Sequence, residues 1–259
     1  MPKSSLYSAI LKLLKTLGLC NGTDTLPACF KIRANGELLI DATMLLCGYL
    51  RTMESVVSWE DACALLVLTF RDNTRREAAV EGGAVAGVAA ADAAVATLYA
   101  TAPAPPDVDA AAAVANIVEE LKNKFATLIV RLYELGVPAV RVLFDGPTPF
   151  LKQAESLERR TLPLFATAIE KAVTERSKNS LDGAIKHILS VCTSSVLVAP
   201  LVAALRSRFP YSSSSFAASL TIAILIGEAD ALFAFRSRSG ITSLTWTRDA
   251  GDRVECIFS

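Results

Sequence analysis

The stretch VRVLFDGP, residues Val140–Pro147, decides the expected fold. Its first five residues are a β-rich and mostly apolar run, which is typical of a buried strand. The Asp-Gly-Pro sequence that follows favours a turn and ends the strand. A helix is predicted before it, at about residues 113–135, and a long helical stretch after it, at about Phe150–Ser194. The pattern therefore predicts a strand placed between helices.

The same alternation of strand and helix runs along the chain. Further strands are predicted at Glu37–Ile40, Leu220–Ile226 and Ile241–Thr247, with helices at about Met44–Met53, Ser58–Phe70 and Glu228–Ser237. The remaining predicted elements are a helix at residues 4–19, a short strand at Cys29–Arg33, a helix at Pro200–Phe209 and a last strand at Val254–Phe258. This alternation predicts an α/β fold with a mostly parallel central sheet and helices on both faces.

Length and composition indicate a protein with a sizeable core. A chain of 259 residues fits one large α/β domain or two small ones, and 52% of its residues are hydrophobic. We expect a single domain over residues 1–259. Within it, residues 74–116 are rich in Ala and Val and contain a Pro-rich run. This composition is typical of a low-complexity insertion that is part helix and part disordered loop.

Charge, cysteine and histidine counts argue against several classes of protein. The 26 basic and 26 acidic residues balance, which does not suit a polybasic protein that coats nucleic acid but allows a nuclease with a local acidic pocket. Six scattered cysteines without a CxxC pair and a single histidine, His187, do not predict a zinc site. The N-terminus does not read as a secretory signal, and the longest apolar run, Phe216–Ile226, is too short to cross a bilayer. An intracellular location is therefore expected.

Acidic residues follow the predicted strands at the points where the strands end. In chain order they are Asp41, Asp145, the pair Glu228 and Asp230, and Asp249 with Asp252 nearby. Because ligands gather outside the carboxyl ends of parallel strands, we expect these carboxylates to share a cleft. Carboxylate oxygens suit Mg²⁺ or Mn²⁺, and two such ions activate water and stabilise the leaving oxygen of a phosphodiester. An aspartate after a strand also commonly caps the next helix, so any one of these acids alone has that simpler interpretation.

Four short motifs resemble those of the flap endonuclease family and occur in the family's order. The stretch Asp145–Lys152, continuing to Glu155 and Arg159-Arg160, resembles the motif FDGxPPxLKxxExxxR. Gly227–Ala231 resembles GEAEA, Thr247–Asp249 resembles TED, and Leu39–Met44 resembles IDASM. The chain therefore resembles the flap endonuclease or XPG-type 5′ nucleases, which implies a PIN-like nuclease fold with residues 74–116 as an insertion.

The resemblance implies a role for each matched residue. Two Mg²⁺ or Mn²⁺ ions would be held by Asp41, Asp145, Glu228, Asp230, Asp249 and Asp252. Lys152 and Arg159 would grip the scissile phosphate, although their helical spacing alone is also typical of a solvated face. Residues 150–195 would form a helical gateway or cap that single-stranded 5′ ends enter. The implied partners are DNA with 5′ flaps or ends and replication or repair proteins, in the nucleus.

Departures from the family pattern leave other functions open. Gly251 stands where the second aspartate of the TEDxD motif is expected, with Asp252 one residue late, and Arg248 replaces an acidic residue. The family's helix-hairpin-helix element, which grips duplex DNA, is not found in the sequence. One alternative is an RNA-directed endonuclease of the same fold. Another is a catalytically inactive scaffold that binds nucleic acid.

Overall fold

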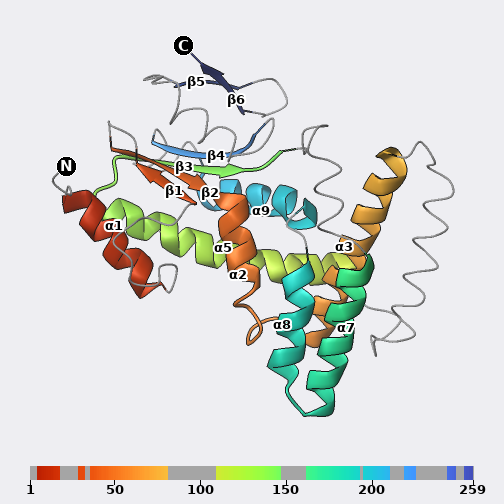
Figure 1. Cartoon of the computed structure of the whole chain (residues 1–259). Coiled ribbons are helices and arrows are strands. Elements are labelled where there is room, and N and C mark those ends of the chain that lie inside the picture. Colours follow the sequence, from red (N-terminus) through yellow and green to blue (C-terminus); the bar gives the residue numbers. More distant parts are fainter. Residues whose placement is uncertain are drawn as a thin grey trace. The chain divides into compact units, whose positions relative to one another are not determined.

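The computed structural model describes residues 5–17, 29–32, 36–80, 109–146, 162–192, 195–210, 219–225, 244–248 and 254–258. Its helices are α1 (Ser5–Thr16), α2 (Ala42–Leu50), α3 (Trp59–Val80), α5 (Ala110–Glu134), α7 (Leu162–Ser177), α8 (Leu181–Val191) and α9 (Ser195–Arg208). Its strands are β1 (Phe30–Ile32), β2 (Glu37–Asp41), β3 (Ala139–Phe144), β4 (Leu220–Ile224), β5 (Leu244–Arg248) and β6 (Val254–Phe258) (Figure 1). The predicted α/β class is confirmed.

The chain forms two compact units. The first consists of Met1–Leu45, Lys122–Pro149 and Val202–Ser259, and the second of Leu46–Leu121 and Phe150–Leu201. The six described strands all belong to the first unit, whereas α3, α7 and α8 belong to the second. The first unit therefore carries the strand ends at which the acidic site is predicted.

A four-stranded sheet with the order β1-β2-β3-β4 is the framework of the first unit (Figure 1). β2, β3 and β4 run parallel, with Ile40 opposite Val142 and Val142 opposite Ile222, and β1 pairs antiparallel with β2. Helices lie in the sequence between the parallel strands, because such strands need crossover connections. The prediction of a mostly parallel sheet is confirmed for these strands.

The two faces of this sheet differ in character. Val140, Val142 and Phe144 alternate along β3, share one face and are fully buried. Phe144 packs against Phe125 of α5, with ring centroids 5.7 Å apart. Figure 1 shows α1 and α5 on the same side of the sheet. The intervening residue Arg141 belongs to the opposite face, which carries polar groups.

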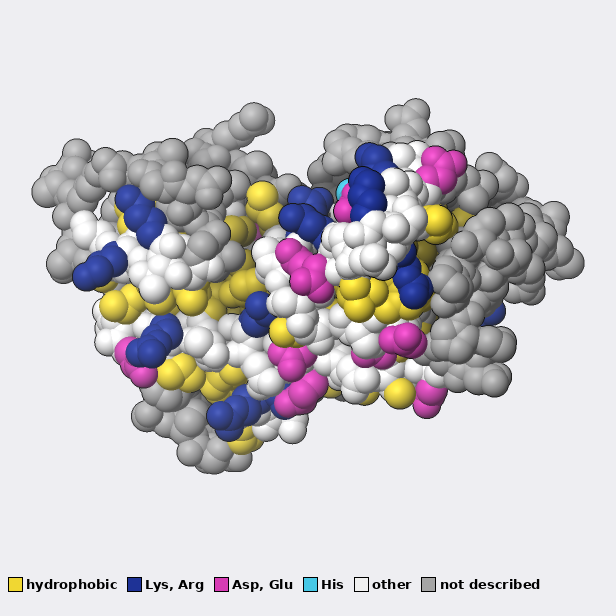
Figure 2. Space-filling model, turned by 90° about the horizontal axis from the view of Figure 1, so that it is seen from below, with side chains coloured by type: hydrophobic (Ala, Val, Ile, Leu, Met, Phe, Trp, Pro, Cys, Tyr) yellow, Lys and Arg dark blue, Asp and Glu magenta, His cyan; other side chains and the backbone are white. Residues whose placement is uncertain are grey.

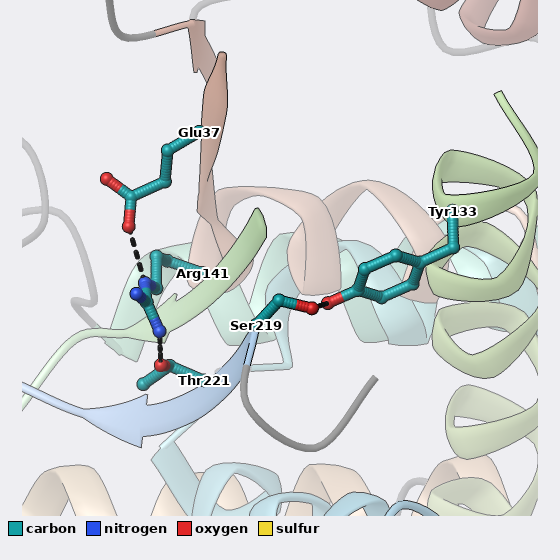
Figure 3. Close-up of polar contacts among 5 residues, drawn as sticks. All are labelled: Glu37, Tyr133, Arg141, Ser219 and Thr221. Atoms are coloured by element: carbon teal, nitrogen blue, oxygen red, sulfur yellow. Dashed lines mark hydrogen bonds and ion pairs between the residues drawn. The ribbon is translucent and has the colours of Figure 1, made fainter. Parts of the chain in front are cut away.

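A polar network crosses three strands on that opposite face (Figure 3). Arg141 Nε donates to Glu37 Oε1 at 2.5 Å, and a guanidinium nitrogen of Arg141 donates to Thr221 Oγ1. Figure 3 also shows a separate contact, in which Ser219 Oγ, just before β4, donates to Tyr133 Oη of α5 at 3.1 Å. Burial raises the pKa of the Tyr133 phenol, so this side chain stays neutral. The contacts of Arg141 with Glu37 and Thr221 fix the register of β2, β3 and β4, since a slip of one residue would move each of these polar groups to the apolar face.

The fourth strand expected in the parallel sheet belongs instead to a separate hairpin. β5 pairs antiparallel with β6 in a two-stranded sheet, with Trp246 opposite Cys256. The short connection at residues 249–253 suits a hairpin, whereas a parallel partner needs a crossover of about a dozen residues or more. For the described part of this segment, residues 244–248, the expectation of a place in the parallel sheet is therefore wrong.

In the second unit, α7 and α8 form a helical hairpin. The chain turns at residues 178–180, where Asn179 has a φ of 59°, a left-handed conformation that asparagine tolerates better than most residues. Phe70 of α3 meets Phe165 of α7 edge to face at 5.6 Å, and the Arg176 guanidinium lies 4.7 Å from the ring centre of Trp59. The predicted helical stretch is confirmed over residues 162–191, where it is divided by this turn.

Two helices extend into the segment predicted as an insertion, residues 74–116. α3 continues to Val80 rather than ending near Phe70, because residues 71–80 include Arg, Glu and Ala, which favour helix, and no Gly or Pro. α5 begins at Ala110, and Asp109 caps it by accepting a hydrogen bond from Ala111 N at 2.9 Å. The rest of the predicted insertion, residues 81–108, lies outside the described residues.

None of the described helices is by itself long and apolar enough to cross a membrane. Only α8 and α9 taken together have the required length and composition, and they are bent by 95° at the break between them. Buried residues such as Ile185 of α8 and Leu205 of α9 show that part of this apolar character serves the protein core.

Candidate functional site

Two of the predicted acids lie at the ends of neighbouring parallel strands. β2 ends at Asp41, whose partner in β3 is Leu143. Asp145 follows two residues later, directly after the end of β3. With about 4.8 Å between strands and a rise of about 3.3 Å per residue, the two aspartate Cα atoms are about 8 Å apart. Aspartates whose Cα atoms are this far apart can direct their carboxylates to one cation.

Asp41 also has the simpler role that its place in the sequence suggests. Its side chain is buried, and Asp41 Oδ1 accepts a hydrogen bond from Met44 N at 2.9 Å. Asp41 therefore caps the first turn of α2, which starts at the next residue. A carboxylate has two oxygens with about four lone-pair sites, so capping a helix and binding a cation are compatible.

The backbone of Asp145 is held from two sides. Leu225 N donates to Phe144 O at 2.8 Å, so β4 stays paired with β3 up to the residue before Asp145. Asp145 N donates to Thr43 Oγ1 at 2.7 Å. Thr43 lies in the first turn of α2, the same turn that Asp41 caps. The side chain of Asp41 and the backbone N–H of Asp145 therefore both bond to the first turn of α2.

A buried cysteine lies next to Asp41. Asp41 N donates to Cys29 O at 2.7 Å, and the Cys29 side chain is buried. Burial raises the pKa of the Cys29 thiol to about 11, a backbone hydrogen bond opposes this rise, and the charge of Asp41 adds to it. The thiol is therefore neutral near pH 7. Because Mg²⁺ and Mn²⁺ prefer oxygen to sulfur ligands, the carboxylates rather than this thiol are the suitable donors at this edge of the sheet.

The other predicted site residues lie outside the described residues. They are Lys152, Arg159, Glu228, Asp230, Asp249 and Asp252. Ile224 at the end of β4 pairs with Phe144, so the segment leading to Glu228 starts at the edge that carries Asp41 and Asp145. The segment with Asp249 and Asp252 connects β5 to β6 and does not follow a strand of the four-stranded sheet. Shared sheet topology therefore does not place these two acids beside the others.

The donor chemistry at this edge fits a hard divalent cation. Mg²⁺ and Mn²⁺ prefer carboxylate oxygens over nitrogen or sulfur ligands. Within the described parts of the chain, no group of three or more His, Cys, Asp or Glu side chains is placed to hold a metal ion. Asp41 and Asp145 are two of the six predicted ligands, and the remaining four lie in segments beyond those parts.

Sequence reasoning missed Thr43 and Arg141. Thr43 stands at a strand-to-helix junction, where hydroxyl side chains commonly bond to backbone groups. This position in the sequence could have predicted such a bond. For Arg141 the signal was a charge inside an otherwise apolar strand. Glu37, which pairs with Arg141, is about 13 Å from Asp41 along β2, so this network supports the sheet without touching the acids.

Charges on the surface shown in Figure 2 are mixed in sign. Lys and Arg side chains alternate there with Asp and Glu, and the described residues on this face form no extended area of one sign. The sequences of α7 and α8 are also mixed in charge, since Glu170 precedes Lys171, and Asp182 lies one helical turn before Lys186. Because nucleic-acid backbones favour concentrated positive charge, this face does not by itself predict a nucleic-acid interface.

No protein-family model matches the chain, and neither a curated protein nor a solved structure does. The sequence motifs and the placement of their residues are therefore the observations that bear on function.

Proposed function

We propose that the chain is a divalent-metal-dependent nuclease with a PIN-like fold, related to the flap endonuclease and XPG-type 5′ nucleases. Its substrate is DNA with 5′ flaps or ends. The observation that carries the proposal is the position of Asp41 and Asp145 at the carboxyl ends of neighbouring parallel strands. Parallel α/β sheets bind their ligands at this edge. The motif around Glu228 supports it, because it follows the next strand of the same sheet.

Each residue has a defined task in this proposal. The acids Asp41, Asp145, Glu228, Asp230, Asp249 and Asp252 hold two Mg²⁺ or Mn²⁺ ions. Cations bound in this way activate water and stabilise charge on the leaving oxygen of a phosphodiester. Lys152 and Arg159 bind the scissile phosphate and neutralise its charge. Residues 150–195 form the gateway that orients a single-stranded 5′ end. The roles of Asp249 and Asp252 also require the β5–β6 hairpin to lie at this edge.

Cleavage of a 5′-labelled DNA flap, with Mg²⁺, Mn²⁺ or a chelator, tests the proposal. The wild type is expected to cut only when metal is present, and Asp145→Ala is expected to lose cutting while keeping its fold. Glu134→Ala is the matched control, because it removes an exposed acid at the end of α5, and it should cut like the wild type. Cutting without metal, or wild-type cutting by Asp145→Ala, would show that these acids are not catalytic.

The β5–β6 hairpin favours a second candidate, a catalytically inactive scaffold that binds nucleic acid. Because β5 pairs antiparallel with β6, the segment with Asp249 and Asp252 does not follow a strand of the parallel sheet, unlike Asp41 and Asp145. A scaffold of this kind would bind labelled flaps without cutting them in any metal. Competition between DNA flaps and RNA of equal length distinguishes the third possibility, an RNA-directed endonuclease of the same fold, because RNA would then be cut preferentially.

A further inference from the structure

The geometry points to Thr43 as a positioning residue that holds Asp145 in place beside Asp41. This inference rests on the proposed function, in which both acids bind the metal ions. Thr43 Oγ1 accepts a hydrogen bond from Asp145 N at 2.7 Å. This one contact is sufficient to hold the backbone of Asp145. The hydroxyl acts on the backbone of a ligand residue, so Thr43 itself need not touch the cation or the substrate.

Thr43 replaces an acceptor that the sheet does not supply at this point. In a parallel ladder, successive residues of a central strand bond alternately to the strands on either side. Phe144 bonds toward β4, since its carbonyl accepts a hydrogen bond from Leu225 N. Asp145, the next residue, therefore faces the β2 side. β2 ends at Asp41 because the chain turns into α2 there, and the Thr43 hydroxyl takes the place of the missing backbone acceptor.

One turn of α2 thereby fixes both acids. Met44 N donates to the Asp41 carboxylate at 2.9 Å, and the preceding residue, Thr43, accepts from Asp145 N at 2.7 Å. The two contacts are made by consecutive residues of a regular helix. A change in the separation of Asp41 and Asp145 therefore requires one of these bonds to break or the helical turn to distort.

This coupling matters because divalent-cation sites tolerate little displacement. Mg²⁺ binds carboxylate oxygens at about 2.1 Å in near-octahedral geometry, and productive sites hold their ligands to within about 0.5 Å. Removing a partner that orients a metal ligand typically weakens metal affinity by about 10–100-fold. The expected signature of losing the Thr43 hydroxyl is therefore weaker metal binding by a protein that still folds.

Thr43→Val and Thr43→Ser form the test pair. Valine keeps the shape of the side chain and removes the acceptor, whereas serine keeps the hydroxyl. Calorimetric titration of the full chain with MnCl₂ is expected to show affinity about tenfold weaker or more for Thr43→Val, and near the wild type for Thr43→Ser. Flap cleavage by Thr43→Val should recover as the Mn²⁺ concentration is raised, because the defect is in metal binding. Thr43→Ala provides a second variant without the hydroxyl if Thr43→Val unfolds.

The outcomes separate this role from the proposed function. If the wild type binds Mn²⁺ and Thr43→Val binds it equally well, the role of Thr43 is wrong and the metal site stands. If Thr43→Val and Thr43→Ser lose affinity equally, packing of the methyl group is responsible, which also overturns the role. If the wild type itself binds no Mn²⁺, the proposed function fails, and the role of Thr43 fails with it.

Discussion

Replacement of Arg141 is expected to destabilise the sheet that carries the candidate site. Arg141 bridges Glu37 of β2 and Thr221 of β4 (Figure 3). The side chains of Arg141 and Glu37 are 20% and 6% exposed, so their ion pair lies between the exposed and the fully buried case. Exposed pairs contribute about 0–1 kcal/mol, and breaking a buried pair costs about 3–5 kcal/mol. We expect Arg141→Met to lower the free energy of unfolding by about 2–3 kcal/mol.

A double-mutant cycle with Glu37→Leu tests this expectation. Each single variant leaves one charge in a shielded position, whereas the double variant replaces the pair with apolar groups and should cost about 1 kcal/mol or less. Urea unfolding followed by circular dichroism gives the four free energies. Arg131→Met is the matched control, because Arg131 and Glu134 are 60% and 52% exposed, and it should cost less than about 1 kcal/mol. Wild-type stability of Arg141→Met, or costs that simply add, would refute a coupled ion pair.

Two further predictions concern the apolar face and the thiol beside Asp41. Phe144→Ala should lower the free energy of unfolding by about 3–5 kcal/mol, because Phe144 is fully buried against Phe125. Phe144→Leu should lower it clearly less. Equal stability of both variants and the wild type would contradict this. At pH 8, iodoacetamide should label Cys29 at least about 100-fold more slowly in the native than in the urea-unfolded protein. The reason is that burial raises the pKa of the Cys29 thiol from 9.0 to about 11. Equal labelling rates would contradict a buried thiol. The unfolded chain loses this proton first as pH rises, so the stability contributed by the neutral thiol is complete below pH 9 and is lost as pH rises through about 11.

Much of the fold was accessible from the sequence because its signals are local. Apolar β-rich runs ended by Asp or Gly predicted β2, β3 and β4, and helical periodicity predicted the helices between them. Periodicity reports the type of an element but not its partner, so it did not show that β5 pairs with β6. Composition was misleading at Val80, because an Ala-rich segment reads as low complexity even where it continues a helix.

The site was accessible from the sequence only in part. Strand order and direction place Asp41 and Asp145 side by side, and a topological rule suffices for that expectation. The Thr43 contact depends on where β2 stops and on the register between β2 and β3, which no motif specifies. The Arg141 network likewise depends on three strands meeting in one register, although the residues come from distant parts of the chain.

The most direct test of the central claim is Mn²⁺ binding by the wild type, Asp41→Asn, Asp145→Asn and Glu134→Gln, measured by electron paramagnetic resonance of the free ion. Asparagine caps helices as well as aspartate does, so Asp41→Asn removes a charged ligand and keeps the start of α2. We predict that the wild type and Glu134→Gln bind Mn²⁺ alike, and that both strand-end variants bind it at least about tenfold more weakly. Absence of binding by the wild type at millimolar Mn²⁺, or unchanged affinity in Asp145→Asn, would contradict a metal site at this edge of the sheet.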